Sequence, residues 1–133
     1  MPVLKVLDAC PVVAFLEGDP CADQGRVLLL RAEEGKVRLA MTVLNLGEVW
    51  YAVARADSPE QSDRLIREIR GMAVEIVGVD RALTREAARL KARRGVSFAD
   101  CFAAALARTR KAELITGDRE FLRLEGEVKI AWL

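Results

Sequence analysis

The chain has 133 residues, a formal net charge of +1, no histidine and three widely spaced cysteines. The lack of histidine excludes Ser-His-Asp and Cys-His catalysis, and without a C-x-x-C pair zinc binding is not expected. The hydrophobic fraction of 52% supports a substantial core, and no apolar run approaches the roughly 20 residues of a membrane span. We therefore expect one globular domain over residues 1–133, located in the cytoplasm and not bound to a membrane.

The first part of the chain predicts alternating strands and helices. In chain order these are a strand at 3–7, a helix at about 11–17, a helix between Asp19 and Gly35, a strand at 37–41 and a helix at 43–56. Asp19 suits the cap of the second helix and Gly35 its end, and Thr42 suits the cap of the third. Each boundary therefore has a local chemical cause.

The same alternation continues to the end of the chain. In order, the elements are a helix from Ser58 to Gly71, a strand at 73–79, a helix over 80–94, a helix capped by Ser97, a strand at 113–116, a short helix and a last strand within 127–133. In the helix over 80–94, Leu83, Ala87 and Leu90 recur at helical spacing and predict one buried face.

Strands that alternate with helices throughout favour a mostly parallel sheet with helices on both faces. We predict an α/β fold, a three-layer α/β/α sandwich around a central, mostly parallel sheet. Ligands of such sheets bind beyond the carboxyl ends of the strands. The residues that directly follow each strand are therefore the first candidates for a functional site.

Two aspartates occupy such positions. Asp8 follows the strand at 3–7, and Asp118 lies in the turn after the strand at 113–116. Each also has a structural interpretation, because Asp8 can cap the next helix and Gly117-Asp118 is a common turn sequence.

Two further acids lie on predicted helices. Asp100 is the only polar residue in the run FADCFAAAL at 98–106, which reads as a buried helix because it is apolar around nearly its whole circumference. A capping box with Ser97 explains its position but not what compensates its charge. Glu48 lies near Asn45 in the early turns of the helix at 43–56, although a solvated glutamate is the ordinary alternative there.

All four acids are predicted at one edge of one sheet. Ionised carboxylates that crowd together repel one another and need a cation between them at neutral pH. Without histidine or a thiolate cluster the ligand set is all oxygen, which selects Mg²⁺ or Mn²⁺ over zinc. Such a metal activates water and offsets charge on a phosphoryl group.

Four segments resemble, in order, the motifs of the PIN domain family, specifically the VapC-like toxin ribonucleases of toxin–antitoxin pairs. They are VLDACPVVAFL, MTVLNLGEVWYAV, SFADCFAAALA and LITGDREF. The resemblance covers nearly the whole chain and implies a single PIN-like nuclease domain. It further implies a metal-dependent endoribonuclease for single-stranded RNA and a cognate antitoxin that covers the acidic pocket.

The resemblance also implies roles for individual residues. The catalytic and metal-binding residues would be Asp8, Glu48, Asp100 and Asp118, which together hold one or two Mg²⁺ or Mn²⁺ ions, with Asp8 and Asp100 in direct contact. The residues that orient water or substrate around them would be Cys10, Asn45, Thr116 and Arg93. For Glu120 an exposed helix glutamate is the favoured interpretation, and a supporting part in the site is the alternative. Cys10 departs from the family pattern, which has a hydroxyl there, and a thiol is a poor partner for Mg²⁺.

A row of arginines on the helix over 80–94 offers one means of holding RNA. Arg81, Arg85, Arg89 and Arg93 recur every four residues and form one ridge. The ridge runs, with Arg94, toward the loop before the third acid. Phosphate binding is one interpretation, and a solvated helix face is the other.

Two other functions remain open. Phospho-acceptor receiver domains also carry acids at strand ends, but they need adjacent acids near the first strand and a lysine after a late strand. Here Asp8 stands alone and Lys111 precedes the strand at 113–116. A catalytically inactive PIN-like module that binds protein or RNA is the second alternative, although this chain keeps all four acids. Apolar helix faces favour a homodimer.

Overall fold

The computed structural model describes the chain except for residues 1 and 18–21, so the predicted cap Asp19 lies outside the described residues. The strands are β1 (Val3–Leu7), β2 (Val37–Thr42), β3 (Val74–Val77), β4 (Glu113–Thr116) and β5 (Ile130–Trp132). The helices are α1 (Ala9–Glu17), α2 (Ala22–Glu33), α3 (Val43–Ala56), α4 (Pro59–Arg70), α5 (Arg81–Arg94), α6 (Phe98–Thr109) and the 3₁₀ helix η1 (Arg119–Leu124).

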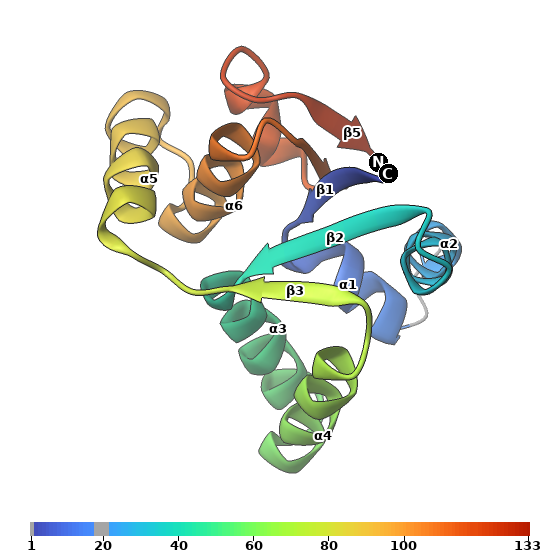
Figure 1. Cartoon of the computed structure of the whole chain (residues 1–133). Coiled ribbons are helices and arrows are strands. Elements are labelled where there is room, and N and C mark those ends of the chain that lie inside the picture. The colour runs from blue at the N-terminus through green and yellow to red at the C-terminus, as the bar shows by residue number, and fades with distance from the viewer. Residues whose placement is uncertain (1, 18–21) are drawn as a thin grey trace.

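The strands form one sheet in the order β3-β2-β1-β4-β5, and every pairing in it is parallel. Strand β1 lies in the middle, where Val6 is in register with Ala40 of β2 and with Leu114 of β4. Figure 1 shows α5 and α6 on one side of this sheet and α1, α3 and α4 on the other. The predicted three-layer α/β/α sandwich is therefore confirmed.

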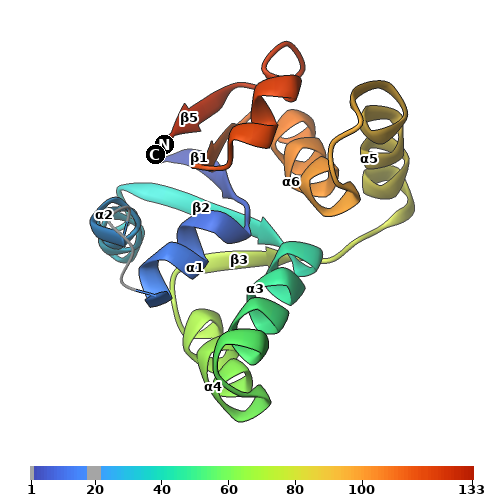
Figure 2. The same ribbon diagram turned by 180° about the vertical axis from the view of Figure 1, so that it is seen from behind.

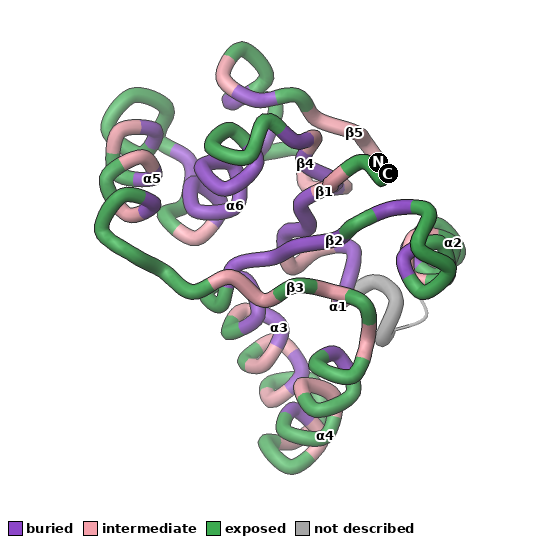
Figure 3. Tube along the Cα trace, in the orientation of Figure 1, coloured by how far each residue is buried: buried purple, intermediate pink, exposed green. Residues whose placement is uncertain are grey.

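Successive side chains of the central strands divide between two cores, because neighbours along a strand point to opposite faces. Val6 and Leu114 belong to the core beneath α5 and α6. Leu7, Met41 and Ile115 belong to the core beneath α1, α2, α3 and α4. In the tube of Figure 3, α6 is almost wholly buried, as its apolar sequence predicts.

Three helix starts follow the predicted capping residues Thr42, Ser58 and Ser97, and Asp80 caps α5 rather than lying within it as predicted. Thr42, Ser58, Asp80 and Ser97 each accept a hydrogen bond from the backbone N–H three residues later. Helix α5 ends at Gly95, whose φ of 68° lies in the left-handed region that glycine tolerates best. Local chemistry thus sets these boundaries.

Several element boundaries differ from those predicted, and β2 extends one residue further, to Thr42. Helix α1 begins at Ala9 rather than near Pro11, because proline is tolerated in the first turn, where its missing N–H needs no helical partner. Strands β3 and β5 are shorter than predicted. Both are edge strands, and each ends where its single neighbour stops pairing with it.

The carboxyl edge of the sheet collects the polar residues. Asp8 directly follows β1, Thr42 ends β2 and Thr116 ends β4, and all three side chains are buried. Within the described part of the chain, no helix is both long and apolar enough to cross a bilayer.

Candidate active site

A pocket of about 240 Å³ lies at the carboxyl edge of the sheet, and all four predicted acids line it. Asp8 comes from the end of β1, Glu48 from α3, Asp100 from α6 and Asp118 from the turn after β4. The pocket therefore gathers carboxylates that lie far apart in the sequence.

Asp8 is the most buried of these acids, with only 2% of its surface exposed. The Thr116 hydroxyl donates a hydrogen bond of 2.8 Å to its Oδ2, while Oδ1 has no hydrogen-bond partner among the described residues. The pKa of Asp8 is raised to about 8, chiefly by burial and also by the charges of Asp100, Asp118 and Glu48, against the lowering effect of the Thr116 hydrogen bond. An orphaned buried oxygen of this kind is suited to a cation.

Thr116 links two of the acids. Its hydroxyl donates to Asp8 and accepts a hydrogen bond of 3.0 Å from the backbone N–H of Asp118. Asp118 in turn accepts one of 2.9 Å from the backbone N–H of Glu120, and so caps η1. The threonine therefore fixes Asp8 relative to the turn that carries Asp118.

Asp100 lies in the first turn of α6 and is 7% exposed. Its backbone N–H donates to the Ser97 hydroxyl at 3.2 Å. The pKa of the Asp100 carboxyl is raised to about 6, chiefly by burial and also by the charges of Glu48, Asp118 and Glu120, against the lowering effect of a hydrogen bond with Ser97. Asp100 therefore takes part both in the cap of α6 and in the acidic pocket.

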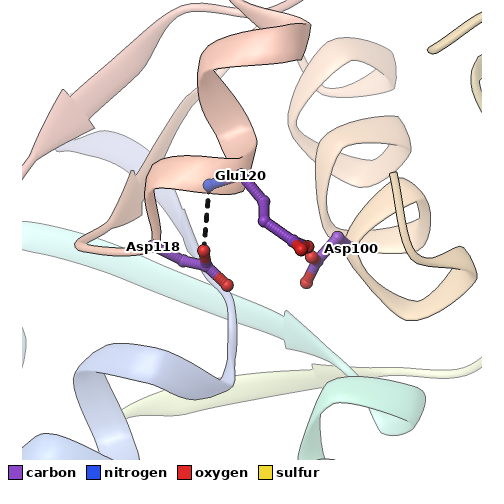
Figure 4. Close-up of side chains that lie close together, drawn as sticks. All are labelled: Asp100, Asp118 and Glu120. Carbon is purple, nitrogen blue, oxygen red and sulfur yellow. Dashed lines mark hydrogen bonds between the residues drawn. The ribbon is translucent and has the colours of Figure 1, made fainter. Parts of the chain in front are cut away.

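Glu120, for which the sequence favours an exposed helix glutamate over a part in the site, lies beside the predicted acids. Asp100, Asp118 and Glu120 each offer a carboxylate oxygen, and these oxygens lie within 4.8 Å of one another. Figure 4 shows the Glu120 side chain reaching from η1 toward Asp100. Glu120 is exposed, as expected, but its carboxylate belongs to the acidic group. Its position two residues after Asp118, in the first turn of a short helix, is the signal that could have indicated this.

Asn45 positions Glu48. The Asn45 side chain is fully buried and its amide donates to Glu48 Oε1 at 2.8 Å and to the carbonyl of Ala99 at 3.2 Å. It therefore joins α3 to the start of α6, next to the third acid.

Cys10 also lines the pocket and is half-buried. Its sulfur lies close to the turn after β4, where a Cβ on Gly117 would be 3.6 Å from Sγ. The residue thus occupies the pocket wall at the position where the family pattern has a hydroxyl.

The donor set of the pocket fits a hard divalent cation. Every acid in it offers carboxylate oxygen. Asp100 and Asp118, together with the neighbouring Glu120, are close enough to share one ion. Asp8 keeps one buried oxygen without a hydrogen-bond partner among the described residues. Oxygen ligands of this kind suit Mg²⁺ and Mn²⁺.

The arginine ridge of α5 is not uniform. Arg89 donates to Glu86 at 2.8 Å and to Glu127 at 3.2 Å, and Arg94 donates to Glu127 at 3.2 Å. Arg93 lies 3.9 Å from Glu127 and remains 61% exposed. Part of the ridge therefore holds the structure together, while Arg81 and Arg85 are exposed and Arg93, at the long distance of its pair with Glu127, is largely exposed as well.

Glu127 also binds Arg108 of α6, which donates to its carboxylate at 3.1 Å and to its carbonyl at 2.7 Å. Replacing Glu127 with glutamine is expected to lower the free energy of unfolding by about 1–2 kcal/mol, because several charge-assisted hydrogen bonds weaken together around a side chain that is only 9% exposed. Thermal unfolding, with the exposed Glu125→Gln as control, measures this. Equal melting temperatures for the two variants would contradict it.

Solved structures similar to this chain include proteins of toxin–antitoxin systems. A chain of VapBC2 from Rickettsia felis, solved on a promoter DNA fragment, has a TM-score of 0.76 at 19% identity, covering 98% of this chain and 99% of that one. A chain of VapBC-5 from Mycobacterium tuberculosis has a TM-score of 0.61 at 26% identity, covering 99% and 98%. Mycobacterium tuberculosis VapC20, described as a sarcin-ricin loop cleaving toxin, has a TM-score of 0.71 at 20% identity, covering 89% and 92%.

A sequence comparison with curated proteins gave no match. The family model of the PIN domain, in contrast, matches residues 5–127, which include every acid of the pocket. The order of the motifs, the sheet and the acidic pocket agree with this match. The chain belongs to the PIN domain family.

Proposed function

We propose that this protein is a metal-dependent endoribonuclease that cleaves single-stranded RNA and acts as the toxin of a toxin–antitoxin pair. The observation that carries the proposal is the single pocket in which Asp8, Glu48, Asp100 and Asp118 meet, with an orphaned buried oxygen on Asp8. Family membership supports nuclease chemistry. It also removes the reason to consider a receiver-like domain.

The four acids would hold one or two Mg²⁺ or Mn²⁺ ions, and Glu120 would add a fifth carboxylate. A bound ion of this kind lowers the pKa of water and offsets negative charge on the scissile phosphate. Asp8 and Asp100 are proposed as direct ligands.

The neighbouring residues would keep these acids in position. Thr116 holds Asp8 by its hydroxyl, and Asn45 holds Glu48 by its amide. Cys10 is proposed to contact water or substrate at the pocket wall, and Arg93 to contact an RNA phosphate. Cleavage is expected to leave 5′-phosphate and 3′-hydroxyl ends.

The proposed partners follow from the neighbours. VapBC2 and VapBC-5 are toxin–antitoxin systems, and VapC20 cleaves the sarcin-ricin loop, which supports a cognate antitoxin and an RNA substrate for this chain. A homodimer and a cytoplasmic location are part of the same proposal.

Removing the metal is the first test. Labelled single-stranded RNA is expected to be cut in Mg²⁺ or Mn²⁺ and to stay intact in EDTA, because in this proposal the bound ion activates the attacking water. Cleavage should return when excess Mg²⁺ is added back, and ligation to the products would identify the 3′-hydroxyl end. Cleavage that persists in EDTA would refute the proposal. A protein that neither cuts RNA nor binds Mn²⁺ in calorimetry would instead be the inactive PIN-like binding module.

A further inference from the structure

We propose that Tyr51 and Arg55 form a nucleotide subsite beside the acidic pocket. In it the Tyr51 ring stacks on one base of single-stranded RNA, and Arg55 contacts the adjoining phosphate. The inference rests on the proposed ribonuclease function and names the part of the protein that holds the strand next to the cleaved bond.

The lining of the pocket changes character along its length. Asp8, Asp100 and Asp118 make one part acidic, whereas another part lies between α1 and α3 and is lined by Ala9, Val13, Tyr51 and Ala52. This second part is mostly apolar, with Glu48 of α3, Cys10 of α1 and the tyrosine hydroxyl as its polar groups. Its chemistry suits the flat, largely apolar face of a base and not the charged backbone.

The size of the pocket limits what can enter it. Its volume of about 240 Å³ is below the roughly 300–1,000 Å³ of sites for drug-sized ligands. A single nucleotide therefore suits it better than a folded segment of protein or RNA.

Tyr51 is a large aromatic side chain that remains 47% exposed. It lies three residues after Glu48 and four before Arg55, so the three side chains follow one face of α3. Figure 2 shows α3 running outward from the edge of the sheet. This face of α3 therefore carries Glu48 at the acidic pocket, then the aromatic ring of Tyr51, and then the cation Arg55 farther along the helix.

Arg55 supplies a positive charge that the protein does not neutralise. Its guanidinium lies 5.3 Å from the centre of the Tyr51 ring, it is exposed, and it forms no ion pair with any carboxylate among the described residues. Arg89 and Arg94, in contrast, are bound to Glu127. Arg55 is the cation of α3, and it has no carboxylate partner among the described residues. Its charge is therefore available to bind a phosphate, as nucleic-acid sites require.

An aromatic ring and an arginine side by side are the usual elements of a site for single-stranded nucleic acid. Stacking on an aromatic ring tolerates every base, since each base has a π-face. The subsite would therefore position RNA of many sequences and leave target choice to other contacts.

Steady-state cleavage of a short single-stranded RNA tests the subsite. Tyr51→Ala is expected to raise KM roughly tenfold, within the range measured when a stacking ring is removed, with little change in kcat. Tyr51→Phe should keep the wild-type KM because the ring remains. Leu30→Ala, which removes an exposed apolar side chain from α2, is the matched control and should also leave KM unchanged.

An abasic substrate gives a sharper readout. RNAs with one abasic nucleotide on either side of the cleaved bond are compared on wild type and on Tyr51→Ala. At the stacked position the abasic RNA should raise the wild-type KM as much as Tyr51→Ala does, and the two changes together should add no further loss. Fully additive losses at both positions would overturn the stacking role.

The phosphate contact is tested by salt. Arg55→Gln is expected to raise KM and to reduce its dependence on salt concentration, while the exposed Arg85→Gln of α5 should do neither. Equal effects of the two substitutions would overturn a specific role for Arg55.

The subsite can fail separately from the proposed function. Calorimetry should give Tyr51→Ala the Mn²⁺ affinity of wild type, which shows that the acidic centre is intact. Wild-type protein that cuts RNA, with an unchanged KM for Tyr51→Ala, would overturn only the subsite and leave the exposed ring to a protein partner. Wild-type protein that cuts no RNA would overturn the proposed function itself.

Discussion

Asp100→Asn is expected to lower the rate of RNA cleavage by on the order of a thousandfold. Asparagine keeps the size of the side chain but loses the charge that binds a divalent cation, and a catalytic metal contributes several kcal/mol to the transition state. Each 1.4 kcal/mol or so corresponds to a factor of ten in rate. Cleavage of labelled RNA in saturating Mn²⁺ measures the loss.

The substitution separates chemistry from folding. Ser97 accepts a hydrogen bond from the backbone N–H of Asp100, and this bond of the α6 cap is kept when the carboxylate is replaced. Melting temperature and circular dichroism should therefore stay near wild type, while calorimetry should show at least about tenfold weaker Mn²⁺ binding. Asp57→Asn, an exposed change outside the pocket, is the control. A variant that cuts RNA at the wild-type rate would remove Asp100 from the site.

Asp8→Asn is expected to abolish cleavage as well and, in the absence of metal, to stabilise the protein at pH 8. The pKa of Asp8 rises from 3.8 to about 8 in the folded protein. Between these values the folded state keeps a proton that the unfolded chain has released, so stability is complete below about pH 4 and is lost as the pH rises to 8. Asparagine cannot ionise, so the stability of the Asp8→Asn variant does not fall in this way as the pH rises.

The measurement is the melting temperature in EDTA from pH 5 to pH 8. Wild type should fall relative to Asp8→Asn by several degrees across that range, and added Mn²⁺ should reverse the order by stabilising wild type more. Parallel curves for the two proteins in EDTA would mean that Asp8 titrates normally. Asp57→Asn again serves as the control for an exposed aspartate.

Helix starts and the positions of the acids follow from short stretches of sequence. Thr42, Ser58 and Ser97 cap helices by hydrogen bonds that span only three residues, so their effect can be read locally. Asp8 and Asp118 follow strands, and parallel pairing brings strand ends to one edge without further information.

Features that depend on distant pairing could not be predicted in the same way. Strands β3 and β5 end where a neighbour stops pairing with them. Arg89 is bound by Glu127, which lies 38 residues away in the chain. The sequence of α5 alone therefore does not show that Arg89 belongs to an ion pair. The reach of Glu120 depends on the tight turn of η1, which sets its side chain toward Asp100.

The hydrogen bond from Thr116 to Asp8 spans 108 residues of the chain. Contacts of such long range form late in folding, because the chain between them must first be ordered. On a ribosome, Asp8 is synthesised first, yet it cannot be held in place until β4 has left the exit tunnel and inserted beside β1. A nascent chain would therefore carry Asp8, Glu48 and Asp100 without a working centre, and the proposed nuclease could attack RNA only after β4 and the turn with Asp118 have been made.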